Sequence, residues 1–128
     1  MRRKTTLSNG EWKIMNLLWE QSPQTFTQLF DALKADTGWA KGTVFTMLER
    51  MEEKGAVRIE TSGRSKLYSP LWEKEQAVGH ETESFLSRVY GGSLGLMVSS
   101  MAGQKALSQE DIDELYAVLR EAEKEMQS

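Results

Sequence analysis

The stretch AKGTVFTMLERMEEKG, residues 40–55, decides the fold. Its apolar side chains recur at the i, i+3, i+4, i+7 spacing that places them on one face of a helix. These side chains are Val44, Met47, Leu48 and Met51. Gly55 favours the left-handed backbone that ends many helices. The stretch therefore predicts a helix over residues 40–54 with one buried stripe and an opposite face free for another role.

A β-hairpin is expected directly after this helix. Residues 56–60, AVRIE, alternate apolar and polar side chains, and residues 66–69, KLYS, form a second extended segment. Residues 61–65, TSGRS, join the two segments. Arg64 and Lys66 make the tip of this hairpin cationic.

Two further helices are expected before residue 40. SNGE at residues 8–11 and TFTQ at residues 25–28 have the form of a capping box, in which a hydroxyl and a carboxyl or amide satisfy free N–H groups at a helix start. Pro23 discourages continuation of the first helix, and Gly38 follows the second. Three helices followed by a hairpin is the order of a winged helix, a helix-turn-helix variant whose third helix enters the DNA major groove.

Composition narrows the function further. The 128 residues contain no cysteine and one histidine, His80, which excludes disulfides, thiolate metal sites and a histidine pair or triad. No apolar run approaches the roughly 18 residues of a membrane span. We therefore expect a cytoplasmic protein that is not an enzyme and needs no cofactor.

The net charge of −3 is unevenly divided. Residues 1–72 hold 11 Lys/Arg and 8 Asp/Glu, for a net charge of +3, whereas residues 73–128 hold 5 and 11, for a net charge of −6. This asymmetry predicts two domains with different roles, a winged helix DNA-binding domain over 1–72 and a helical dimerisation domain over 73–128.

The expected DNA-binding residues lie on the third helix and the hairpin. Lys41, Arg50, Arg64 and Lys66 can neutralise phosphate, and the tail at residues 2–4, RRK, adds positive charge. Thymine methyls or phosphates can be contacted from the helix face by short or apolar side chains. Thr43, Phe45 and Thr46 carry such side chains, and Gly42, which has none, completes the expected contact face of the helix.

Two side chains of this helix leave alternatives open. Phe45 either faces DNA or folds back onto the second helix. Glu49 either accepts a hydrogen bond from a cytosine amino group or lies beyond the groove.

Residues 73–128 are expected to form a long helix, a break at Gly91 and Gly92, a short apolar helix and a final helix. About 56 residues bury too little surface to be stable alone, so a two-fold dimer is expected to cover their apolar stripes. The alternative is that these helices fold back onto their own winged helix. The expected dimerisation residues are Phe85, Leu86, Val89, Tyr90, Leu94, Met97, Val98, Met101, Leu115, Tyr116 and Leu119.

Four stretches together resemble the BlaI/MecI penicillinase-repressor family. GEWKIMNLLW at residues 10–19 is similar to the first helix of the family, and GTVFTMLER at residues 42–50 to its recognition helix. LYSP at residues 67–70 is similar to its strand after the wing, and FLSRVYGG at residues 85–92 to its dimerisation segment. The resemblance extends from Leu7 to about Leu119.

The resemblance implies a cytoplasmic bacterial repressor that binds, as a homodimer, inverted repeats overlapping promoters, typically those of β-lactamase, antibiotic-resistance or copper-handling genes. It also implies release by a membrane sensor-protease system, through cleavage at the bond matching Ser100-Met101. The Asn-Phe pair of the family is absent at that bond. Copper-responsive relatives use a cysteine-rich metal hook, which this chain cannot form.

Two rival functions are weighed against this expectation. One is a winged helix that contacts only proteins, which the overall negative charge favours. The other is a repressor of the same shape that a small ligand, rather than cleavage, releases from DNA.

Overall fold

The computed structural model describes residues 6–128. The chain divides into two compact units, Met1–Glu81 and Thr82–Ser128. The basic tail at residues 2–4 lies outside the described residues.

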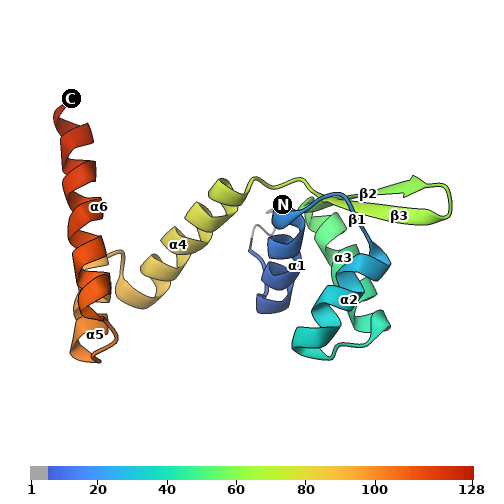
Figure 1. The fold of residues 1–128 in the computed structure, drawn as a ribbon, viewed down its shortest axis with the longest axis horizontal. Coiled ribbons are helices and arrows are strands. Elements are labelled where there is room, and N and C mark those ends of the chain that lie inside the picture. Colours follow the sequence, from blue (N-terminus) through green and yellow to red (C-terminus); the bar gives the residue numbers. More distant parts are fainter. Residues whose placement is uncertain (1–5) are drawn as a thin grey trace. The chain divides into compact units, whose positions relative to one another are not determined.

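The first unit contains three helices and a small sheet (Figure 1). In chain order these are α1 (Asn9–Glu20), β1 (Gln24–Thr25), α2 (Phe26–Thr37), α3 (Lys41–Lys54), β2 (Val57–Ser62) and β3 (Ser65–Pro70). The sheet is antiparallel, in the order β1-β3-β2. The hairpin of β2 and β3 extends away from the three helices as a wing. The expected mainly helical fold with one hairpin is confirmed.

The helix boundaries follow from local chemistry. Ser8 and Glu11 form a capping box at the start of α1, and Thr25 and Gln28 form one at the start of α2, both as the sequence predicts. Gly55 ends α3 with a φ of 80°, in the left-handed region that only glycine adopts without strain.

The core of the first unit lies where the three helices meet the sheet. Leu48 and Met51 of α3 are fully buried there, as is Tyr68 of β3. Trp72 packs against this core, and its carbonyl accepts a hydrogen bond of 2.9 Å from the indole nitrogen of Trp19. The remaining buried apolar side chains are Leu7, Ile14, Met15, Leu18, Leu29, Leu33, Val44, Ala56 and Val57.

The wing is tighter than the sequence suggested. Its strands pair as far as Ser62 and Ser65, so that two residues, Gly63 and Arg64, make the turn in place of five. Gly63 has a φ of 61°, which a two-residue hairpin turn requires at its first position. The turn therefore brings Arg64 to the tip of the wing.

Strand β1 was not expected. It pairs Gln24 with Tyr68 and Thr25 with Leu67, and so joins the start of α2 to the inner half of the wing. The buried side chain of Gln24 donates from Nε2 to the carbonyls of Leu17 and Gln21, at 2.9 and 2.7 Å. A strand of two residues carries no periodic pattern, so the sequence held no signal for it.

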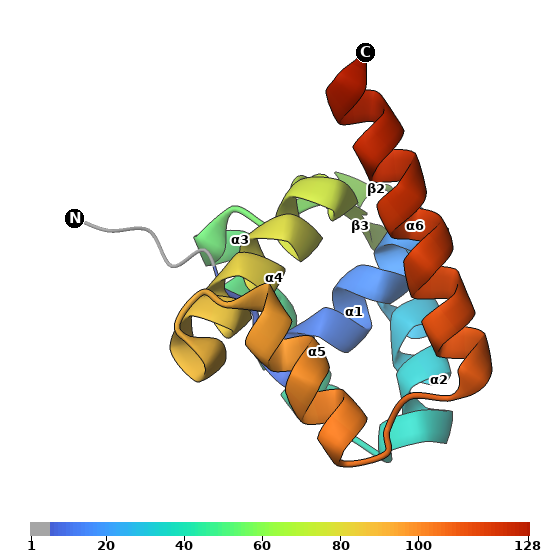
Figure 2. The ribbon, with the colours of Figure 1, turned by 90° about the vertical axis from the view of Figure 1, so that its left-hand side faces the viewer.

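Helix α4 (Lys74–Tyr90) begins in the first unit, and its end, α5 (Leu94–Gly103) and α6 (Gln109–Gln127) make up the second. Helix α4 ends before Gly91 and Gly92, as expected, and both glycines have positive φ angles. Figure 2 shows α5 and α6 joined by a short connection. None of these three helices has a fully buried residue. Among the described residues, no helix has both the length and the apolar character to cross a membrane.

Candidate nucleic-acid interface

Helix α3 has one buried face and one exposed face. Val44, Leu48 and Met51 are buried, and Met47 is half-buried against the same core. The opposite face carries a mixed, weakly basic set of exposed side chains that includes most of the expected DNA-binding residues. Those exposed residues are Lys41, Gly42, Thr43, Phe45, Thr46, Glu49 and Arg50.

A shallow hollow lies on this exposed face. Its lining includes Gly42, Thr43, Thr46 and Arg50. A Cβ atom added at Gly42 would meet no other atom within 4 Å, so the backbone there is open to a close approach. The hollow thus presents hydroxyl groups and one guanidinium around a bare stretch of backbone, which suits contact with a phosphate or a base edge.

The wing contributes two exposed cations. Arg64 lies at the turn and Lys66 on β3, where it pairs in register with Thr61. Arg58, the third basic residue of the hairpin, forms an ion pair with Glu60 of the same strand. Arg64 and Lys66 are therefore better placed than Arg58 to bind an anionic partner.

Aromatic rings line the surface between the wing and the helices. Phe45 of α3 lies against Phe26 of α2, with ring centroids 6.2 Å apart, and Phe26 is stacked on Phe30 at 6.1 Å. The ammonium group of Lys66 lies 5.5 Å from the centroid of Phe45, and that of Lys41 lies 5.7 Å from the centroid of Phe30. Phe45 nonetheless remains 41% exposed, so it both contacts the second helix and reaches the surface.

The rings of Phe26 and Phe45 border a groove of about 380 Å³ between the wing and the start of α2. Thr25, Thr27 and Ser65 contribute hydroxyl groups to its lining, and Arg64 and Lys66 contribute positive charge. Phe26 and Phe30 of α2 are both half-buried. On α2, the ammonium group of Lys34 lies over the ring of Phe30. The four-residue spacing of these two residues is the sequence signal for this contact.

Tyr68 lies beneath this surface and is 1% exposed. Burial raises the pKa of its hydroxyl above the usual 10.0, and the carboxylates of Glu52 and Glu49 raise it further.

The second unit exposes much of its apolar surface. Of the expected dimerisation residues, exposed side chains belong to Phe85, Val89, Leu94, Met101, Leu115, Tyr116 and Leu119. Half-buried side chains belong to Leu86, Tyr90, Met97 and Val98. Val98 of α5 lines an open apolar pocket of about 230 Å³ together with four residues of α6, Ile112, Leu115, Tyr116 and Leu119. A surface this apolar is typical of a protein interface.

The bond between Ser100 and Met101 lies inside helix α5. Ser100 is half-buried and Met101 is 38% exposed. A protease that binds its substrate in an extended form would have to unwind this part of α5.

Comparison with known proteins extends over both units. The model of the penicillinase repressor family matches residues 7–121. The penicillinase repressor of Bacillus licheniformis is 31% identical over 121 residues, which cover 94% of each chain. These matches include α1 to α5 and the first turns of α6.

Solved structures match the first unit. The DNA-binding domain of the repressor BlaI has a TM-score of 0.53 and 27% identity, covering 58% of this chain and 90% of that one. Monomeric Bacillus licheniformis BlaI in complex with the blaP half-operator has a TM-score of 0.50 and 27% identity, covering 55% and 85%. With a family model matched over nearly its whole length and a winged helix fold, the chain belongs to the penicillinase repressor (BlaI/MecI) family of DNA-binding transcriptional repressors.

Proposed function

We propose that the protein is a cytoplasmic repressor that binds a near-palindromic operator as a homodimer. Residues 1–72 read the DNA and residues 73–128 hold the two chains together. The observation that carries this proposal is the exposed, polar face of α3 beside a wing with two exposed cations, Arg64 and Lys66, in a chain whose net charge is −3. The similarity of the first unit to BlaI in complex with a half-operator supports it.

In this arrangement α3 enters the major groove. Thr43 and Thr46 contact bases or phosphates, and the open backbone at Gly42 allows the DNA to come close. Lys41 and Arg50 neutralise phosphates beside the groove, while Arg64 and Lys66 hold the backbone next to the wing. Phe45 borders the groove on the protein surface between the wing and the start of α2.

The homodimer is formed through α4, α5 and α6. Their exposed apolar side chains need a partner surface, and a second copy presents the same surface in a two-fold arrangement. Two recognition helices in successive major grooves lie about 34 Å apart, which requires two half-sites in inverted order. Repression then follows because the bound dimer occludes the promoter.

Release from DNA is proposed to follow cleavage at Ser100-Met101 by a membrane sensor-protease system. This bond separates Val98 from Ile112 and Leu115 in the chain, although the three line one pocket. A cut there divides the residues that build the dimerisation surface. Release by a small ligand is the alternative, and mass spectrometry of protein from induced cells distinguishes the two by the presence or absence of a fragment ending at Ser100.

Selection of duplexes from a random pool tests DNA binding and symmetry together. The expected result is an inverted repeat whose half-site centres lie one helical turn apart, bound with an affinity that falls as salt rises. A protein-interaction module would retain no duplex even at low ionic strength, and that result would refute the proposal.

A further inference from the structure

Lys66 is held against an aromatic ring of the recognition helix. Its ammonium group lies 5.5 Å from the centroid of Phe45, within the range of a cation–π contact. Phe45 in turn lies against Phe26 at 6.2 Å, with the rings tilted by 60°. The contact joins the wing, α3 and α2 in one row of side chains.

The topology of the sheet explains why these three residues meet. Strand β1 pairs Thr25 with Leu67, so Phe26, the next residue along the chain, starts α2 beside the position of Lys66 on β3. Phe45 approaches the same point from the first half of α3. Backbone pairing thus fixes two members of the row, and the third belongs to the helix that carries the expected base contacts.

An ordered ammonium group differs from an ordinary surface lysine. A free lysine side chain gives up considerable rotamer freedom when it is fixed on a phosphate. Contact with the Phe45 ring restricts Lys66 before DNA arrives, and the ring also fixes the direction of Lys66 relative to α3. Arg64 lies at the turn, beyond the strands, and is not part of this row.

We propose that Phe45 is a positioning residue for DNA binding, which acts through Lys66. Its ring holds the Lys66 ammonium group beside α3, so that a backbone phosphate of the operator is bound at a fixed place relative to the recognition helix. This inference rests on the proposed function, because it assumes that the first unit binds duplex DNA. It assigns Phe45 an indirect role rather than a contact with a thymine methyl group.

A double-mutant cycle on one operator duplex tests the coupling. Lys66→Ala in the wild-type background removes one phosphate contact, which makes the negative slope of log K against log salt shallower by about 0.9. The fall in affinity between 50 and 200 mM salt then becomes about 3- to 4-fold smaller. Phe45→Leu is expected to cause part of the same loss, and Lys66→Ala is expected to have a clearly smaller effect in the Phe45→Leu background.

Three controls separate this role from a general effect on the fold. Phe45→Trp keeps an aromatic face and is expected to retain the wild-type salt slope. Arg64→Ala is expected to cause the same loss with Phe45 or Leu at position 45. In the free protein, NMR signals of the Lys66 side-chain methylene groups are expected to show an upfield ring-current shift that Phe45→Leu abolishes.

Three outcomes would overturn the inference. One is additivity of Phe45→Leu and Lys66→Ala, and another is a loss of salt slope in Phe45→Trp as large as in Phe45→Leu. The third is an unchanged slope together with reduced preference for thymine over deoxyuridine at one position, which would assign Phe45 a direct contact with the methyl group. Failure of the wild-type protein to bind any duplex would instead refute the proposed function itself, with the ring-current shift still reporting whether the side-chain contact forms.

Discussion

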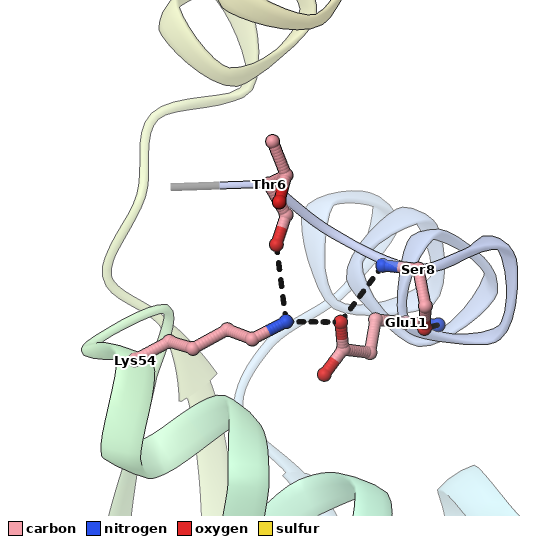
Figure 3. A network of polar contacts seen from close by, with 4 residues as sticks. All are labelled: Thr6, Ser8, Glu11 and Lys54. Atoms are coloured by element: carbon pink, nitrogen blue, oxygen red, sulfur yellow. Dashed lines mark hydrogen bonds and ion pairs between the residues drawn. The ribbon is translucent and has the colours of Figure 1, made fainter. Parts of the chain in front are cut away.

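Lys54, the last residue of α3, donates a hydrogen bond of 2.5 Å to Oε1 of Glu11 in the first turn of α1 (Figure 3). The same ammonium group donates to the carbonyl of Thr6 at 3.0 Å, and the same carboxylate oxygen accepts from the backbone N–H of Ser8 at 2.8 Å. Glu11 is only 3% exposed. The end of the recognition helix is therefore fixed to the start of α1 by a largely buried ion pair.

Replacing one partner of this pair is expected to destabilise the protein strongly. Lys54→Met would leave the Glu11 carboxylate buried without its cation, at a cost of about 3 kcal/mol in the free energy of unfolding. Urea denaturation followed by far-UV circular dichroism measures this loss. Glu11→Gln is expected to recover part of the stability in the Lys54→Met background, because the neutral amide needs no cation.

A second ion pair provides the matched control. The Nζ atom of Lys13 lies 2.7 Å from Oδ2 of Asp36, but the two side chains are 46% and 62% exposed. Water screens such a pair, so Lys13→Met is expected to cost less than about 1 kcal/mol. Equal losses at Lys13 and Lys54 would contradict the role assigned to burial.

The raised pKa of Tyr68 predicts that the protein loses stability at alkaline pH. Burial raises the pKa of its hydroxyl in the folded state above the unfolded value of 10.0, with smaller contributions from Glu52 and Glu49. The folded protein consequently holds this proton more tightly than the unfolded chain. Its contribution to stability is fully present below about pH 10 and is lost as the pH rises from there toward the folded pKa.

Urea denaturation at a series of pH values from about 9 to 11 tests this prediction. The free energy of unfolding of Tyr68→Phe is expected to fall less steeply over this range than that of the wild type. Parallel curves for the two proteins would show that Tyr68 does not contribute to the alkaline slope.

Substitutions of Arg64 and Thr46 are expected to change DNA binding in different ways. Arg64→Ala removes a phosphate contact, so affinity falls to a similar extent on every duplex and the negative slope of log K against log salt becomes shallower by about 0.9. Thr46→Ala removes a contact within the groove, so it narrows the ratio between operator and unrelated DNA by a factor that corresponds to about 1–3 kcal/mol. Fluorescence anisotropy with both duplexes, at several salt concentrations, measures the two effects.

Lys124 near the end of α6 serves as the control for that experiment. Lys124→Ala removes the same charge as Arg64→Ala at a distant position in the chain and is expected to change neither slope nor ratio. A loss of discrimination in Arg64→Ala would show that the wing reads sequence rather than backbone.

Leu119 is expected to be essential for dimer formation. It is exposed and lines the pocket with Val98 and Leu115, so Leu119→Glu would place a charge where a second copy buries apolar surface. Analytical ultracentrifugation at micromolar concentration should then show single chains, while far-UV circular dichroism retains the helical signal. Glu121→Ala on the same helix is the control and is expected to remain dimeric; single chains in the wild type would refute the dimer.

The sequence by itself predicted the starts and ends of the helices in the first unit. Ser8, Thr25 and Gly55 act on backbone groups within a few residues, so the local pattern is sufficient to place them. The buried stripe of α3 followed from helical spacing for the same reason, and with it the exposed face that carries Thr43 and Thr46.

Only the tertiary structure revealed the contacts between distant parts of the chain. The pairing of Glu11 with Lys54 spans 43 positions, and the contact of Phe45 with Lys66 crosses from a helix to a strand. Strand β1, which brings Phe26 to that contact, has two residues and no pattern of its own. Such relationships depend on where the packed core places each backbone segment, and no local rule of spacing or capping contains that information.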